Sequence, residues 1–143
     1  MEVIDGKSLD ASLPLPHEQV RQILSQITAA LEAVHLQGLV HGDIKAENLF
    51  LTSEGGVKLM DFGLMIPAGQ PAPAIQGTLA YMAPEIARRD KVDARTDLYA
   101  LGVLAYLLLA GELPFAHEDP VRLLRAHLED LPVPVGDRVP GVP

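Results

Sequence analysis

The sequence contains no cysteine, which excludes disulfide scaffolds, thiolate zinc sites and cysteine nucleophiles. It is also poor in basic residues, because 11 Lys and Arg stand against 19 Asp and Glu, for a net charge of −8. Binding to a nucleic-acid backbone depends on clustered Lys and Arg side chains. We therefore expect no nucleic-acid partner for this chain.

Long hydrophobic runs are missing as well. The longest apolar run extends from Ala100 to Ala110, which is 11 residues, whereas a helix that spans a bilayer needs about 20. This run therefore predicts a buried helix and no membrane segment. The first residues do not form a cationic and apolar leader, so we expect no secretory signal and a cytoplasmic location.

The composition is that of a globular protein. The chain has 143 residues, of which 48% are apolar and 21% charged, so one domain with a substantial core is expected. Apolar residues at steps of three and four predict helices, and two short apolar segments around a Gly-Gly turn predict a β-hairpin. The expected helices cover residues 18–35, 84–89, 94–110 and 120–128, and the expected strands cover residues 48–52 and 57–60. Residues 67–74 and the Pro- and Gly-rich tail after Leu131 are expected to be irregular.

Several polar motifs follow one another in a fixed order. The segment 41–48 reads His-Gly-Asp-Ile-Lys-Ala-Glu-Asn and lies between the first helix and the hairpin, and 61–63 reads Asp-Phe-Gly directly after the hairpin. Gly-Thr at 77–78, Ala-Pro-Glu at 83–85 and Asp97 come next. Each motif alone is weak, but the ordered set is specific.

This set resembles the C-terminal (large) lobe of eukaryotic-type serine/threonine protein kinases, and bacterial members most of all. The resemblance implies a mainly α fold with a small β-hairpin, over a partial kinase domain at residues 1–131 that comprises the hinge and the large lobe. Residues 132–143 would be the tail of a truncated lobe. The N-terminal lobe and the last helices of the family would be missing, since the sequence has no Gly-rich phosphate loop and no Ala-x-Lys strand.

The resemblance also implies the catalytic roles. Asp43 would accept the proton of a substrate hydroxyl, and Lys45 would neutralise charge on the transferred phosphoryl group and contact ATP. Asn48 and Asp61 would hold Mg²⁺ and, through it, the nucleotide, because amide and carboxylate oxygens are hard ligands. The hairpin explains how residues 13 positions apart can face one metal ion. The implied cofactors are therefore ATP and Mg²⁺.

The adenine would lie between the hinge and the sheet. Glu2 and Ile4 would offer hinge backbone groups, and Phe50 would lie beneath the base. The implied partners are a protein substrate with Ser or Thr and a missing N-terminal lobe, supplied in cis or in trans.

Supporting residues follow from the same resemblance. Thr78 would contact the catalytic Asp, and His41 and Phe62 would stack in the core behind the site. Glu85 normally pairs with an Arg that this chain lacks in the right context. Asp97 would accept backbone N–H groups of the catalytic loop; alternatively, Thr96 or Asp97 would cap the helix expected at residues 94–110.

One departure from the family concerns regulation. Gly42 stands where most members have an Arg that grips a phosphate, and residues 64–76 contain no Ser, Thr or Tyr. The two facts agree, and they predict regulation without phosphorylation of this loop. Four further histidines have no metal-ligand spacing and are expected at surface or half-buried positions: His17, His35, His117 and His127.

The sequence therefore predicts a serine/threonine kinase that transfers the γ-phosphate of ATP to a protein hydroxyl, with little or no activity in the isolated chain. The alternative is a non-catalytic, pseudokinase-like remnant that acts as a protein-binding module. A metal-binding protein unrelated to kinases is disfavoured, because Asn48 and Asp61 alone are too sparse for a protein-only site.

Overall fold

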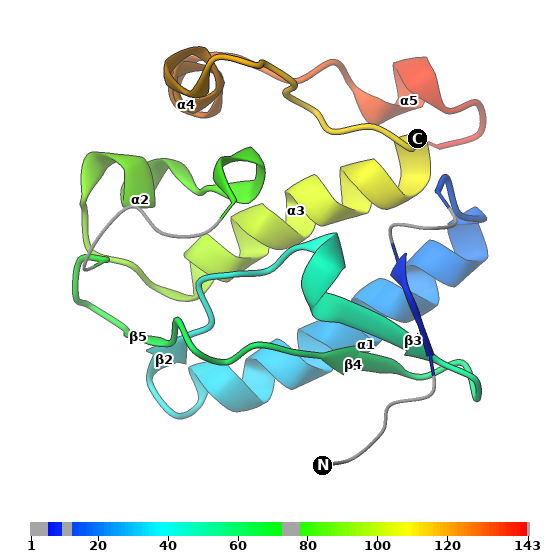
Figure 1. Cartoon of the computed structure of the whole chain (residues 1–143), viewed down its shortest axis with the longest axis horizontal. Helices are drawn as coiled ribbons and strands as arrows, with labels where there is room; N and C mark the ends of the chain where they lie inside the picture. Colours follow the sequence, from blue (N-terminus) through cyan, green and yellow to red (C-terminus); the bar gives the residue numbers. More distant parts are fainter. Residues whose placement is uncertain (1–5, 10–12, 73–77, 143) are drawn as a thin grey trace.

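The computed structural model describes residues 6–9, 13–72 and 78–142. Glu2 and Ile4, the expected hinge residues, lie outside the described residues. The elements run along the chain as β1 (Gly6–Ser8), α1 (His17–His35), β2 (Leu39–Val40), β3 (Leu49–Thr52), β4 (Val57–Leu59), β5 (Ile66–Pro67), α2 (Pro84–Arg88), α3 (Ala94–Ala110), α4 (Pro120–Glu129) and α5 (Val135–Arg138) (Figure 1). The expected mainly helical architecture with a small hairpin is observed.

The two long helices α1 and α3 pack against each other and carry most of the core. Helix α1 is amphipathic and buries five of its 19 residues, whereas α3 buries seven of 17. The prediction that the apolar run lies in a buried helix is thus confirmed. Leu98 of α3 is an exception, because half of its surface is exposed.

The hairpin β3–β4 forms as predicted, and β1 extends it to a three-stranded antiparallel sheet. A second, two-stranded sheet pairs β2 with β5 and was not predicted. Each of its strands has only two residues, which is too short for a period to show, and Pro67 lies within a segment that reads as a loop. The sheet matters for the site because it ties the chain after Asp61 to the chain before His41.

The second sheet is buttressed by a small hydrophobic cluster, separate from the main core. Its members lie on β2, on β5 and the loop after it, and around α2, and they are Val40, Ile66, Ala72, Met82, Ile86 and Val92. Gly69 N donates to Val92 O at 2.8 Å and Val92 N donates to Gln70 O at 3.0 Å. These contacts hold the described part of the loop after β5.

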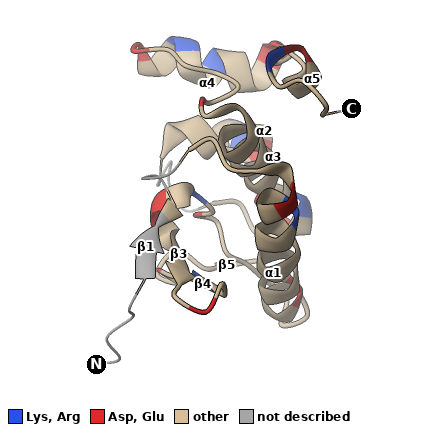
Figure 2. Ribbon diagram, turned by 90° about the vertical axis from the view of Figure 1, so that its right-hand side faces the viewer, with Lys and Arg blue, Asp and Glu red and all other residues tan. Residues whose placement is uncertain are grey.

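The C-terminal elements lie along one edge of the molecule (Figure 2). Helix α4 is attached by a buried His127, whose ring contacts Phe115 and whose Nδ1 is 2.6 Å from the Tyr99 hydroxyl of α3. The expectation that the tail has no element is wrong, since Val135–Arg138 form a one-turn helix. Pro134 precedes this turn with a φ of −54°, and Arg138 pairs with Glu112.

Over the described ranges, no helix is both long and apolar enough to cross a membrane.

Candidate active site

The loop between β2 and β3 gathers the polar residues of the 41–48 motif. Asn48 donates its side-chain N–H groups to the backbone and side-chain oxygens of Asp43, both at 2.9 Å. Lys45 Nζ lies 3.2 Å from Asp43 Oδ2 and 3.3 Å from Thr78 Oγ1. The structure therefore brings Asp43, Lys45, Asn48 and Thr78 together, with Lys45 between the carboxylate and the hydroxyl.

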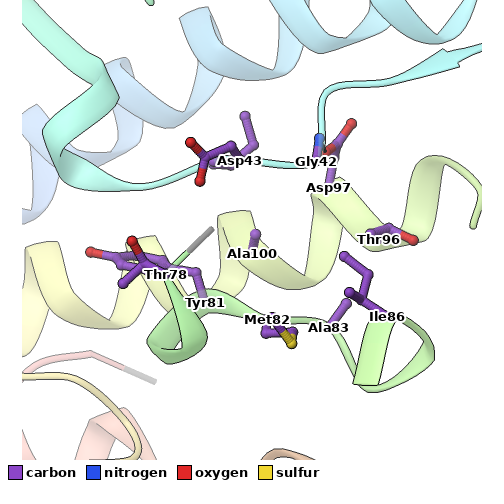
Figure 3. A pocket seen from close by; sticks show the side chains of 11 residues that line it. Gly42, Asp43, Thr78, Tyr81, Met82, Ala83, Ile86, Thr96, Asp97 and Ala100 are labelled. Carbon is purple, nitrogen blue, oxygen red and sulfur yellow. Dashed lines mark hydrogen bonds between the residues drawn. The ribbon is translucent and has the colours of Figure 1, made fainter. Parts of the chain in front are cut away.

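Asp43, Thr78 and Ala100 line a small cavity of about 20 Å³, with Asp43 and Thr78 on different segments of the chain (Figure 3). Asp43 and Asn48 are both buried, each with 8% of the residue surface exposed. Thr78 contacts the lysine, where a contact with the aspartate was expected.

Asp61 follows the hairpin and is brought back toward the loop. Met60 N donates to Asn48 O at 2.8 Å, so the end of β4 lies beside the start of β3. Asp61 is exposed and has a φ of 59°, a left-handed backbone that is uncommon for residues other than glycine. Such conformations gather at functional sites.

Several carboxylates act on the buried ring of His41. Burial lowers the pKa of His41, and the carboxylates of Asp97, Asp43 and Asp61 oppose that shift. Within the described residues, no group of three or more His, Asp or Glu is placed to hold a metal ion unaided.

Asp97 holds the start of the 41–48 loop through hydrogen bonds to its backbone. Its carboxylate is 1% exposed and accepts hydrogen bonds from His41 N at 2.8 Å and Gly42 N at 2.9 Å. The alternative role as a helix cap is wrong, because Asp93 caps α3 by accepting from Arg95 N at 2.8 Å. The expected backbone contacts of Asp97 are thus confirmed.

Gly42 has a structural reason to be glycine. Its φ is +79°, and a Cβ there would lie 3.2 Å from Cδ1 of Ile66 (Figure 3 shows Gly42 beside Asp97). An Arg at this position would be strained and would have to displace the Ile66 side chain. The loop after Asp61 is thus packed on the residue that replaces the usual Arg.

Three other expectations fare differently. Glu85 accepts a hydrogen bond from Thr96 Oγ1 at 2.6 Å in place of the usual Arg. Phe62 meets His41 edge-on with ring centroids 5.3 Å apart, but 52% of Phe62 is exposed, so its expected placement in the core is wrong.

Phe50 is half-buried and alternates with the core residues Leu49 and Leu51, which places it on the outer face of the sheet.

Sequence reasoning missed His35. Its Nε2 lies 2.7 Å from Oδ2 of Asp97, across 62 positions of sequence. The only local signal is its place in the last turn of a predicted helix, which says nothing about a distant partner.

Comparison with known proteins agrees with this geometry. The family described as "Protein kinase domain" matches residues 1–135. The chain belongs to the protein kinase family. Members of this family generally use ATP with Mg²⁺ and act on hydroxyl groups of proteins.

The relatives that this chain matches include bacterial serine/threonine-protein kinases. PknB of Mycobacterium leprae is 35% identical over 99% of this chain and 24% of the relative. Pkn1 of Myxococcus xanthus is 44% identical over 99% of this chain and 22% of the relative. PknL of Mycobacterium tuberculosis is 38% identical over 100% of this chain and 38% of the relative. The chain thus spans between 22% and 38% of the length of these relatives.

Proposed function

We propose that this chain forms part of the catalytic domain of a serine/threonine protein kinase, which transfers the γ-phosphate of ATP to a protein Ser or Thr hydroxyl. The observation that carries the proposal is the contact between Lys45 and both Asp43 and Thr78. A buried carboxylate and a cation side by side can take a proton from a hydroxyl while stabilising charge on the phosphoryl group.

Asp43 is the proposed proton acceptor. Its carboxylate accepts a hydrogen bond from the Asn48 side-chain amide and forms an ion pair with Lys45, so two residues hold it in position. Lys45 is the proposed contact to the transferred phosphate. Little covalent chemistry is required of the protein in phosphoryl transfer, so this positioning supplies much of the rate.

Asn48 and Asp61 are the proposed ligands of Mg²⁺. The donor set fits a hard cation, because the Asn48 amide nitrogen is engaged by Asp43 and its oxygen can turn to a metal. Mg²⁺ takes one or two protein oxygens together with phosphates and water, which accords with the two-residue set. At this place a bound Mg²⁺ ion would supply positive charge to offset that of the ATP phosphates.

The adenine is proposed to contact Phe50 on the outer face of the sheet and the backbones of Glu2 and Ile4.

We further propose that residues 1–131 are the hinge and large lobe and that residues 132–143 are its tail. A small lobe is proposed to act on the outer face of the sheet, in cis or in trans. The exposed Phe62 ring supports such a cover. The proposed location is the cytoplasm.

A transfer assay with radiolabelled ATP and a Ser/Thr-containing protein tests the proposal. The purified chain alone is expected to transfer little or no phosphate. The chain fused behind the small lobe of a relative such as Pkn1 is expected to transfer phosphate, and Asp43→Asn is expected to abolish the transfer.

A fusion that binds ATP but shows no transfer above its Asp43→Asn control would contradict the proposal. It would instead favour the non-catalytic, protein-binding alternative.

A further inference from the structure

We propose that the segment joining α2 to α3 is a docking surface for an acidic segment of the protein substrate. That this partner is a substrate rests on the proposed function, whereas the surface itself does not. The segment comprises residues 88–95 and forms a basic turn. Its four cations are Arg88, Arg89, Lys91 and Arg95.

The basic turn has a charge opposite to that of the rest of the chain. Its four cations and the two carboxylates of Asp90 and Asp93 give a net charge of +2, so the other 135 residues carry −10. The net charge of those other residues repels an acidic segment, and a patch of opposite sign steers it on approach. Charge complementarity therefore favours an acidic partner at this turn.

The four cations of the basic turn are available to a partner. Each of them is exposed, and within the described part of the chain none forms an ion pair. By contrast, the exposed Arg21 of α1 is paired with Glu18. Inside the turn, the Asp93 carboxylate accepts a hydrogen bond from Arg95 N and is thereby engaged in capping α3. Positive charge is thus left over at the surface.

The backbone of Arg89 supports a role for its side chain. Arg89 lies at the C-terminal end of α2, and its φ of 58° is in the left-handed region. Glycine is usual at such a helix end, because a residue with a side chain is strained there. The turn is closed by Asp90 N, which donates to Glu85 O at 2.9 Å. An arginine therefore occupies a place where glycine would cost less, and conformations of this kind gather at functional sites.

The basic turn is held next to the proposed site. Hydrogen bonds from the N–H and to the carbonyl of Val92 pair the turn with the loop after β5. Ile86 and Thr96, which flank the turn, line the same small cavity as Asp43 and Thr78 (Figure 3). A substrate whose hydroxyl lies at Asp43 therefore has the basic turn within reach of its neighbouring residues.

Fluorescence anisotropy of a labelled peptide tests the surface on the unaltered chain. The probe is a short peptide of alternating Glu and Gly, and a peptide of alternating Gln and Gly is the neutral control. We expect the acidic peptide to bind at low salt and to be released as salt screens the charges. An acidic peptide that binds no better than the neutral one overturns the proposal.

A pair of double variants locates the binding. Arg89→Gly with Lys91→Gln removes two charges from the turn without adding strain, since glycine suits a positive φ. Arg21→Gln with Arg125→Gln is the matched control, because it changes the net charge equally at two other exposed sites. We expect the affinity for the acidic peptide to fall about fivefold in the first pair and less than about twofold in the control. Equal losses overturn the proposal, because the net charge would then explain the binding.

Two further measurements on the unaltered chain make the test independent of any variant. Amide NMR shifts caused by the acidic peptide should gather at residues 88–95, and shifts that gather elsewhere overturn the proposal. The turn has no aromatic side chain on which bases could stack. A single-stranded DNA with the same number of charges should therefore bind no more tightly than the peptide. Tighter binding of the DNA at these residues would overturn the assignment to an acidic protein segment.

The fused, active form tests whether the docked partner is a substrate. Two substrates share one Ser-containing peptide, which a flexible Gly-Ser spacer joins to either the acidic or the neutral probe. Docking raises the local concentration of the hydroxyl, so the acidic substrate should have a lower KM at a similar kcat. Arg89→Gly with Lys91→Gln should remove this difference in KM.

The outcomes separate the docking surface from the proposed function. Binding located at residues 88–95, with a fusion that transfers phosphate to neither substrate, would leave the docking surface standing and refute the proposed function. An active fusion with the same KM for both substrates would refute the docking proposal and leave the proposed function standing.

Discussion

The two sides of the catalytic loop differ in how they are completed. On the anchored side, defined by His41, Gly42 and Asp97, residues of this chain supply the hydrogen-bond partners and the packing contacts. On the open side, defined by Phe50, Asp61 and Phe62, a ring and a carboxylate face outward. The chain therefore completes the anchored side with its own residues and leaves the open side, the proposed nucleotide side, exposed.

The largest expected effect is on the anchored side. Asp97→Asn removes a buried charge with three donors and leaves at least one N–H without an acceptor, which should lower the free energy of unfolding by about 3 kcal/mol. Urea denaturation followed by circular dichroism measures it. Asp93→Asn is the matched control, because Asn caps helices about as well as Asp. A loss for Asp97→Asn no larger than that of the control would contradict the anchor.

A smaller effect is expected at Gly42. Gly42→Ala should cost about 1–2 kcal/mol, since an L side chain at positive φ is strained and its Cβ presses on Ile66. Gly38→Ala is the control, because its φ of +71° is similar but nothing lies within 4 Å of its Cβ. The excess of Gly42→Ala over Gly38→Ala measures the contact, and Ile66→Val should reduce that excess. No excess would show that the loop is not packed on position 42.

Acid should weaken the fold through two buried histidines. Burial lowers the pKa of His41 and of His127 below the ordinary 6.5, so the unfolded chain binds more protons. Their contribution is complete above pH 6.5, falls as the pH drops through 6.5, and levels off below the folded pKa. The urea concentration at the unfolding midpoint should therefore fall as the pH is lowered from 8 to 5, and it should fall less in His127→Gln. Identical slopes would contradict the burial of His127.

The smallest effect is expected on the open side. Phe62→Ala should cost less than about 1 kcal/mol in the isolated chain, because the ring is 52% exposed, whereas a fully buried Phe costs about 3–5 kcal/mol. In the fusion with a small lobe the cost should rise. Chemical denaturation of both forms measures the difference, and a cost of 3 kcal/mol in the isolated chain would show that Phe62 is already covered.

The sequence predicted those parts of the fold that repeat a local pattern. The period of apolar residues predicted α1, the long apolar run predicted α3, and the Gly-Gly turn between two short apolar segments predicted the hairpin β3–β4. The β2–β5 pair and helix α5 did not, because two strand residues or one helical turn carry no period. These elements depend on contacts with distant segments.

The site divides in the same way. Asp43, Lys45 and Asn48 lie in one motif, and their mutual contacts follow from short chain separations and the hairpin. The His35–Asp97 hydrogen bond joins residues 62 positions apart, and the local sequence around neither residue indicates it. Phe62 was expected inside because the family resemblance placed it in the core, but the exposure of a residue depends on what covers it, which a motif does not specify.

The most direct test of the two-sided account is an NMR titration of the isolated chain with Mg²⁺–ATP. The account predicts weak binding, with amide shifts at Phe50, Asn48 and residues 61–63, and none along α3 or α4. Shifts that gather on the anchored side or around α4, with the open side unperturbed, would contradict it.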